Sequence, residues 1–333
     1  LALPIAAALL AAGSAALTGG ASAAPPGAVP PGFARAEAAL EWIGDRLPDV
    51  ANAYGLGAGQ LQRMFLTDPT LAVDGAGELA YFDEAVPGAL AADPAPAAGA
   101  TDPPPAGNEF GLASLPGADK TIYLDFDGHV TEGTSWNAAY GVTTIVSPPY
   151  SRDGDSSTFS STELQIIRES WAAVAEDFAP WNVNVTTIDP GAEALRRSGA
   201  GDTQWGARVV ITADTFANCG CGGHAYIGSF DDSQDEPTFV YNTSFVGVAE
   251  AISHEVGHML LLNHDGLTSG ASYYSGHSAS GMPSWGPIMG AGYNVSVTHW
   301  SGPQYYLANN GQDDTAIIGG FGNGNDFGVR SDD

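Results

Sequence analysis

Between residues 120 and 262 the apolar residues follow strand spacing in some stretches and helical spacing in others. Runs rich in β-branched and aromatic residues predict five strands, at residues 121–126, 182–188, 208–212, 225–230 and 238–241. Helical spacing predicts two helices, at residues 161–178 and at about 246–262, the second capped by Ser244. Residues 266–303 have no clear period and are dominated by Gly, Ser, Tyr and Pro, so an irregular lobe is expected after the second helix.

The N-terminal part of the chain has a pattern of its own. Residues 33–47 have helical apolar spacing. Two short strand-like runs, residues 71–73 and 79–82, flank the turn signal Asp74-Gly75 and predict a hairpin. A small helical and hairpin unit is therefore expected before the main domain.

A change of composition separates this unit from the rest. Residues 86–118 are rich in Ala, Pro and Gly, which is the composition of a linker. The uncharged, Ala-rich run at residues 1–17, followed by the small-x-small pattern at residues 21–23, predicts a secretory signal whose start is missing. The predicted boundaries are a signal peptide at 1–23, a propeptide-like segment at 24–85, a linker at 86–118, a main domain at 119–320 and the start of a truncated C-terminal extension at 321–333.

Composition narrows the classes of partner. The 333-residue chain has 10 Lys and Arg against 38 Asp and Glu, a formal charge of −28, which argues against nucleic acid and anionic membranes as partners. No apolar run beyond the signal is long enough to cross a bilayer, and we expect a secreted, extracellular monomer. The two cysteines, Cys219 and Cys221, could form a strained disulfide, remain thiols or serve as soft metal ligands, the last being the weakest interpretation.

The chemistry of the chain is concentrated in one motif on the second predicted helix. His254 and His258 are four residues apart, so both imidazoles lie on one helix face and can bind one metal ion. Glu255 lies between them, within reach of a metal-bound water. Such a pattern can also arise by chance as two surface histidines and a solvated glutamate, so the rest of the chain must decide.

A third ligand is available just beyond that helix. His264 follows at the position where the chain turns away from the helix end. A downstream carboxylate ligand is nearly excluded, because Glu255 is the last glutamate and no aspartate lies between Asp265 and Asp313. His277 is the best spare ligand should His264 not serve.

These residues resemble the metzincin clan of zinc endopeptidases, and within it the reprolysin (adamalysin) family and its secreted bacterial relatives. His254, Glu255, His258, His264 and Asp265 match the family motif residue by residue. The resemblance implies an α/β (α+β) zincin fold: a twisted mixed sheet with an active-site helix and a backing helix, then an irregular, coil-rich C-terminal lobe containing a methionine turn. It also implies a catalytic domain over residues 119–320.

The resemblance assigns further roles. Met289, in Pro-Ile-Met-Gly, matches the methionine turn beneath the metal, and residues 223–229 resemble the family's edge strand. The substrate-binding residues implied on that strand are Ala225, Tyr226, Ile227 and Gly228. The family glycine at which the helix turns toward the third ligand is Leu261 here, so either that leucine is strained or the turn shifts. The tyrosine ligand of some relatives is not carried over to Tyr293.

The resemblance implies a secreted, zinc-dependent endopeptidase made as a zymogen, which hydrolyses extended peptide or protein substrates. Glu255 would act as general base toward a zinc-bound water held with His254, His258 and His264. Latency cannot use a pro-segment thiolate, because residues 24–85 have no cysteine; a carboxylate such as Asp68 or Asp74 is one candidate. The alternatives are an inactive metal-binding surface or adhesion module, and a zinc hydrolase of non-peptide substrates. A structural Ca²⁺ at residues 319–326 is the weakest cofactor prediction.

Overall fold

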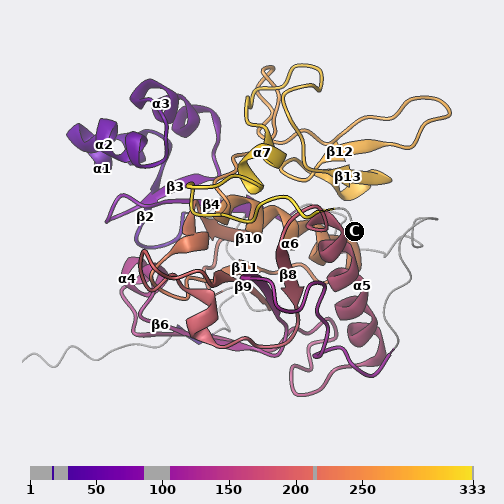
Figure 1. The fold of residues 1–333 in the computed structure, drawn as a ribbon. Helices are drawn as coiled ribbons and strands as arrows, with labels where there is room; N and C mark the ends of the chain where they lie inside the picture. The colour runs from indigo at the N-terminus through magenta and orange to yellow at the C-terminus, as the bar shows by residue number, and fades with distance from the viewer. Residues whose placement is uncertain (1–16, 19–28, 86–105, 213–215, 332–333) are drawn as a thin grey trace, which may run out of the picture.

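The structure is a computed structural model that describes residues 17–18, 29–85, 106–212 and 216–331. Its centre is an eight-stranded mixed sheet (Figure 1). In spatial order the strands are β2 (Phe33–Arg35), β3 (Leu71–Asp74), β4 (Leu79–Glu84), β10 (Cys221–Tyr226), β11 (Thr238–Val240), β9 (Trp205–Ile211), β5 (Lys120–Asp125) and β8 (Val183–Thr186). The pairs from β2 to β11 are antiparallel, and those from β11 to β8 are parallel.

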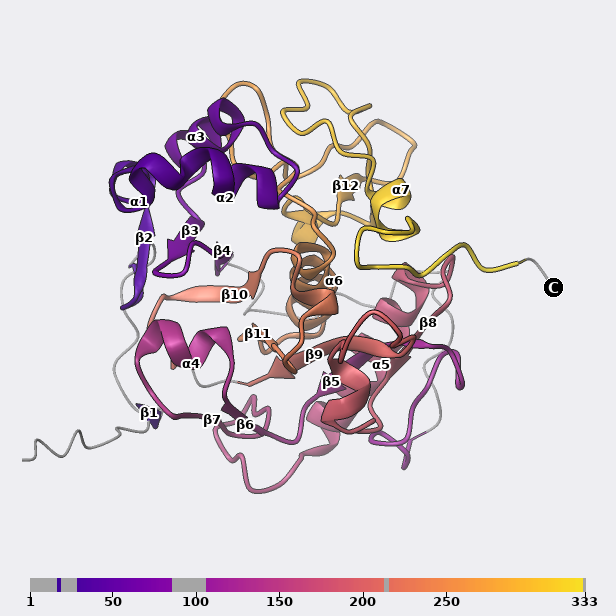
Figure 2. The same cartoon turned by 60° about the vertical axis from the view of Figure 1, so that its left-hand side comes forward.

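Two long helices cover one face of this sheet. α5 (Ser161–Asp177) and α6 (Phe245–Met259) pack on each other and bury the main hydrophobic core against β5, β8, β9 and β11. Each begins at a serine cap, Ser160 for α5 and Ser244 for α6. In Figure 2, α6 runs through the middle of the molecule, with α5 beside it. The predicted mixed sheet with two helices on it is confirmed.

The N-terminal segment is built into the same sheet. It carries α1 (Ala36–Ile43), α2 (Leu47–Ala53) and α3 (Ala58–Thr67), which pack around a core of their own on the β2–β4 end of the sheet. The predicted hairpin is β3 and β4. The helix predicted over residues 33–47 starts only at Ala36, because Phe33–Arg35 pairs as β2, and α3 had no prediction.

Shorter elements complete the fold. On the opposite face of the sheet lies α4 (Ser135–Tyr140), and β1 (Leu17–Thr18), β7 (Thr144–Ser147) and β6 (His129–Glu132) form a small sheet. The C-terminal lobe contains β12 (Trp285–Pro287), β13 (Val297–His299) and α7 (Asp314–Ile318). Figures 1 and 2 place this lobe beside the indigo N-terminal helices.

Two segments outside the predicted main domain, residues 106–118 and 321–331, pack against it. Residues 106–118, assigned to the linker, pack on the main domain: Leu112 is buried and Ala113 pairs with Thr186. Residues 321–331, assigned to an extension, also lie against it, with Phe327 in the main core. Apart from Leu17 and Thr18, the predicted signal peptide lies outside the described residues, as does the linker up to residue 105. Among the helices that the structure describes, none is long and apolar enough to cross a membrane.

Candidate metal centre

α6 places His254 and His258 on its buried face, and the turn after it brings His264 to the same point. The helix ends at Met259, and the amides of Leu261 and Leu262 bond back to the carbonyls of His258 and Gly257. This pair of bonds is a Schellman motif, in which the residue at Leu261 adopts a left-handed backbone. Leu261 has φ +75°, so the turn stays where the glycine of the family would be.

The three imidazoles face one another through their Nε2 atoms. His258 Nε2 lies 3.1 Å from His264 Nε2. His254, His258, His264 and a fourth residue, Asp83 of β4, each offer an atom, and these four atoms all lie within 4.8 Å of one another. His277 is not in this group; it is exposed and bonds to Tyr274.

Each histidine of the group is oriented by an oxygen atom on its other nitrogen. Nδ1 of His254 lies 2.7 Å from the Ile288 carbonyl, and Nδ1 of His258 lies 2.8 Å from that of Leu262. Nδ1 of His264 lies 2.7 Å from the Asp68 carboxylate. These acceptors hold the proton on Nδ1 and leave the Nε2 lone pairs converging, which is how metal-binding histidines are arranged. Buried and aimed at one point, the nitrogen donors fit Zn²⁺ better than Ca²⁺ or Mg²⁺.

The residue that sequence reasoning missed is Asp83. Its carboxylate lies 3.1 Å from His254 Nε2, 3.2 Å from His258 Nε2 and 3.0 Å from His264 Nε2. Burial by itself would raise the pKa of Asp83, yet the three imidazoles hold it well below the usual range. The hydroxyl of Tyr273 donates to Asp83 Oδ1 at 2.9 Å. Asp83 directly follows a predicted strand, but no local pattern shows that this strand lies beside α6.

Glu255 lies next to this cluster and is almost completely buried. Its side chain packs on the backbone of Gly223 in β10, where an added Cβ would come within 2.1 Å of Glu255 Oε1. Burial, together with the neighbouring Asp83 carboxylate, raises the pKa of Glu255 well above its usual range. Its other oxygen, Oε2, has no hydrogen-bond partner. Such a carboxyl is suited to exchange protons with a bound group.

Met289 lies under α6. It is fully buried, and its Sδ fills the space above Gly257 of α6, where an added Cβ would meet it at 2.4 Å. Its carbonyl accepts from the amide of Asp265, and the neighbouring Ile288 carbonyl orients His254. The Asp265 side chain accepts from Ser301 and ties the turn after His264 to the C-terminal lobe.

The strand predicted to bind substrate is shifted toward the N-terminus. Ala225 and Tyr226 belong to β10, but the strand begins at Cys221, whereas Ile227 and Gly228 lie in the turn that leads to a short helix at Ser229–Asp231. Gly228 has φ +74°, which ends the strand earlier than the apolar run suggested.

The second histidine and cysteine group is structural. Cys219 and Cys221 form a disulfide. His224 stacks between the rings of Phe82 and Phe239, on the face of the sheet away from α6. Burial lowers the pKa of His224 to about 3, so this ring is neutral. The loop predicted as a calcium site is closed by its own contact, in which Asp326 accepts from the Gly322 amide.

Residues 152–265 match the family model described as metallo-peptidase family M12B, reprolysin-like. Over these residues the chain is similar to the reprolysin-like metallopeptidases. The match contains His254, Glu255, His258, His264 and Asp265, which confirms the resemblance seen in the sequence. The reprolysin-like region includes neither Met289 nor the N-terminal segment with Asp83. Comparison with curated proteins and with solved structures gave no match.

Proposed function

We propose that the protein is a secreted, zinc-dependent endopeptidase that uses His254, His258 and His264 to hold the metal. The observation that carries this proposal is the convergence of three Nε2 atoms beside the buried carboxyl of Glu255, within a reprolysin-like segment. A zinc ion held there would polarise a peptide carbonyl and lower the pKa of water.

Glu255 is the general base in this proposal. It takes a proton from the attacking water and delivers one to the leaving amine, so its carboxyl must alternate between charged and neutral forms. Its burial beside Gly223 places it between the histidines and β10, where a substrate backbone would lie.

β10 is the strand on which an extended peptide would pair. On one side it bonds to β11, and on the other it bonds to β4, so a peptide could pair there only if β4 were displaced. Peptides that add a strand to such an edge gain affinity from main-chain hydrogen bonds. A cavity of about 90 Å³ beside Glu255, lined by Gly223, Ala291 and Tyr293 among others, would accept a side chain near the cleaved bond.

The test is the substitution Glu255→Gln. We expect the variant to bind zinc as the unmodified chain does, because the three histidines are unchanged, but to hydrolyse casein at least about 10³-fold more slowly. Activity is measured on the intact chain and after limited proteolysis within residues 86–105, and zinc by elemental analysis. Undiminished hydrolysis by the variant would contradict the role of Glu255.

A second candidate is a metal-binding module without peptidase activity. The position of Asp83 favours it, since three histidines and a carboxylate make a closed four-ligand set of the kind found in structural zinc sites. Zinc binding without hydrolysis by any form of the chain, cut or uncut, would support this candidate.

A further inference from the structure

We propose that reduction of the Cys219–Cys221 disulfide creates a second metal site, in which the two thiolates and His224 bind one Zn²⁺ ion. In the oxidised chain these three residues are structural, and the inference concerns the reduced chain. Spacing alone made metal binding the weakest interpretation of the two cysteines, and the placement of His224 beside them changes it. This site does not depend on the endopeptidase proposed above.

The first argument is the arrangement of the three residues. One atom from each of Cys219, Cys221 and His224 lies within 4.8 Å of the other two, and all three residues are buried. In a regular strand, Cys221 and His224 would point to opposite faces of the sheet, because they are three residues apart. The pairing of β10 with β4 shifts register between Cys221 and Gly223, and both side chains lie on the face away from α6. This irregularity brings the imidazole to the sulfur atoms.

The second argument is that His224 has unused ligand atoms. Its ring is fully buried, and neither Nδ1 nor Nε2 has a hydrogen-bond partner among the residues that the structure describes. An unpaired buried polar group costs free energy, and a phenylalanine would stack between Phe82 and Phe239 without that cost. A metal ion on one nitrogen accounts for an imidazole at this position. Because burial lowers the pKa of His224 to about 3, the ring is neutral and one nitrogen keeps a free lone pair.

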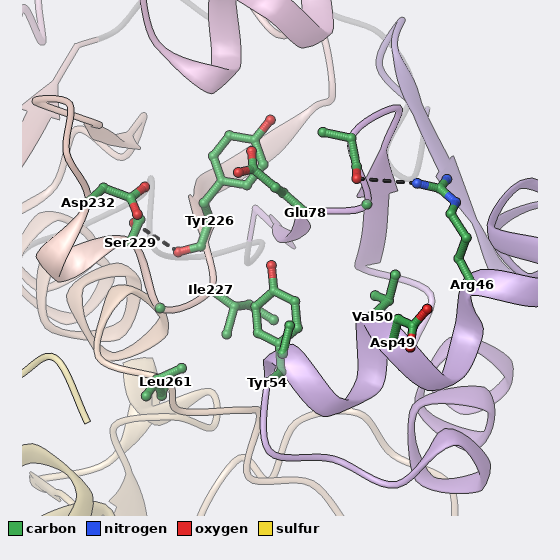
Figure 3. A pocket seen from close by; sticks show the side chains of 14 residues that line it. Arg46, Asp49, Val50, Tyr54, Glu78, Tyr226, Ile227, Ser229, Asp232 and Leu261 are labelled. Carbon is green, nitrogen blue, oxygen red and sulfur yellow. Dashed lines mark hydrogen bonds between the residues drawn. The ribbon is translucent and has the colours of Figure 1, made fainter. Parts of the chain in front are cut away.

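Polar side chains at the other end of β10 find partners in the chain itself. Figure 3 shows the pocket of about 500 Å³ there, where Ser229 donates to the Tyr226 carbonyl and Arg46 to the Ala76 carbonyl. Both of these side chains are satisfied by backbone atoms. His224 lies two residues before Tyr226 on the same strand and has no such partner within the described part of the chain.

The third argument is the chemistry of the three ligands. Thiolates and imidazoles are the ligands that Zn²⁺ takes in many proteins. Two thiolates, a neutral imidazole and Zn²⁺ together carry no net charge, which suits a site walled by aromatic rings. Zn²⁺ takes four ligands, and a cavity of about 50 Å³ that touches both cysteines has room for a water molecule as the fourth.

The fourth argument is that the bridge can open while the fold is kept. It joins residues two positions apart, so it closes a loop too short to restrict the unfolded chain strongly. Gly220 lies between the cysteines with φ +62°, and a glycine can change its backbone angles at little cost as the sulfur atoms separate. Asn218 is exposed and Gly220 is half-buried, so the bridge lies directly beneath the surface.

A dithiol reductant balances the reaction. It transfers two electrons and two protons to the bridge and is itself oxidised to a disulfide, so that Cys219 and Cys221 become thiols. Binding of Zn²⁺ then releases both thiol protons to water and forms two zinc–sulfur bonds. The reverse exchange with a disulfide returns the electrons, re-forms the bridge and expels the ion. The group therefore binds zinc only under reducing conditions.

The experiment uses the full chain and Co²⁺ as the probe. The oxidised chain is first saturated with Zn²⁺ and desalted, then reduced with a phosphine, which becomes a phosphine oxide with an oxygen atom from water. After the phosphine is removed without air, Co²⁺ is titrated in. Cobalt bound to thiolates gives intense charge-transfer absorption in the near ultraviolet, whereas cobalt bound to three histidines does not. We expect one Co²⁺ with this absorption per reduced chain and none in the oxidised chain.

Two variants test the role of His224. His224→Phe keeps the ring stack but removes the nitrogen ligand. It should bind Co²⁺ at least about 100-fold more weakly, because even the outer partners of a metal site contribute about 10–100-fold to affinity. His299→Phe, at an exposed histidine, is the control and should match the unmodified chain.

The other outcomes overturn the inference. They are the absence of charge-transfer absorption in the reduced chain, equally tight binding by His224→Phe, and failure of added Zn²⁺ to displace the cobalt. Should His224→Phe not fold, the unmodified reduced chain still decides: Zn²⁺ should protect both thiols from iodoacetamide, and equal alkylation with and without Zn²⁺ contradicts the site. None of these measurements uses hydrolysis of casein, which tests the proposed function separately.

Discussion

At the scale of single residues, Leu261 is where the sequence and the backbone conflict. Its left-handed conformation, φ +75°, costs a leucine on the order of 1–2 kcal/mol compared with glycine. The surrounding side chains hold it in place: Gln312 donates to the Leu261 carbonyl and accepts from the Asn263 amide, and Asn325 donates to the Leu260 carbonyl. The turn toward His264 is thus enforced by residues about 50 positions downstream.

Strain at Leu261 predicts an unusual order of stability. Leu261→Gly and Leu261→Ala both lose the leucine side chain, but only glycine accepts the left-handed backbone without a clash. We expect the glycine variant to be the more stable by about 1 kcal/mol in urea unfolding. The control is the same pair of substitutions at Gln165, an exposed position in the interior of α5. There we expect Gln165→Ala to be more stable than Gln165→Gly. Equal stability of the two Leu261 variants would mean that the turn relaxes to a different conformation.

The site residues that could be predicted were those with local spacing. His254, Glu255, His258 and His264 lie within eleven residues of chain, and their spacing alone brought them together on α6 and its following turn. Asp83, Asp68 and Tyr273 could not be predicted, because their positions depend on how β4 and the C-terminal lobe pack against that helix.

At the scale of elements, the contact between α6 and Met289 fixes the floor of the site. At position 257, glycine leaves room for the Met289 sulfur, whereas an added Cβ would lie 2.4 Å from it. An interior glycine costs a helix about 1 kcal/mol relative to alanine. The close approach of Met289 accounts for its presence in the middle of α6.

This contact predicts a change of sign in stability. Gly257→Ala should destabilise the protein by about 1–2 kcal/mol, because overpacking against the fully buried Met289 outweighs the better helix propensity. In a Met289→Ala background, the same substitution should become neutral or stabilising by up to about 1 kcal/mol. Urea unfolding of the four proteins measures the coupling. Additive effects would show that Met289 does not limit the space at Gly257.

Elements with a regular spacing of apolar residues were predicted better than strands whose extended conformation depends on pairing with neighbouring strands. α5 was predicted within one residue, since a long apolar stripe marks it. β10 was placed too late along the chain, because its first residues, Cys221-Gly222-Gly223, have no strand propensity. They are extended because Cys221 and Gly223 pair with β4 and Gly223 also pairs with β11.

At the scale of the whole molecule, buried carboxyl groups make stability depend on pH. Burial raises the pKa of Glu236 to about 8, and that of Asp232 and of Glu250 to about 7. A carboxyl whose pKa is higher in the folded than in the unfolded chain binds more protons when folded. Its contribution to stability is complete below the unfolded value, near 4.5 for Glu236, and is lost as pH rises through about 8.

We therefore expect the urea concentration at the unfolding midpoint to decrease as the pH rises from 5 to 9. Glu236→Gln keeps an oxygen to accept from the Ser135 amide but cannot ionise. Between pH 5 and pH 9, the unmodified chain should lose on the order of 2–5 kcal/mol of stability that the variant keeps. At pH 4 the substitution should change stability little. Replacing the exposed Glu41 by Gln is the control. A variant with the pH profile of the unmodified chain would show that Glu236 is not the titrating group.

The whole-molecule arrangement was the least predictable from sequence. The order of a small N-terminal unit, a linker and a main domain follows from composition, but β2, β3 and β4 extend the sheet of the main domain through pairing with β10. Strand pairing between positions so far apart in the chain leaves no mark on either segment's own pattern. Nothing in residues 71–84 alone therefore distinguishes a separate hairpin from one that fills the site.

The pairing of β4 with β10 has a consequence for how the chain would behave once it is cut. Because β4 and β10 belong to one chain, they meet at a fixed effective concentration whatever the protein's own concentration. One cut between Glu84 and Lys120 makes the same contact bimolecular, so it weakens as the protein is diluted. The two parts of a cut chain would stay together in a concentrated solution and separate after release into a large volume.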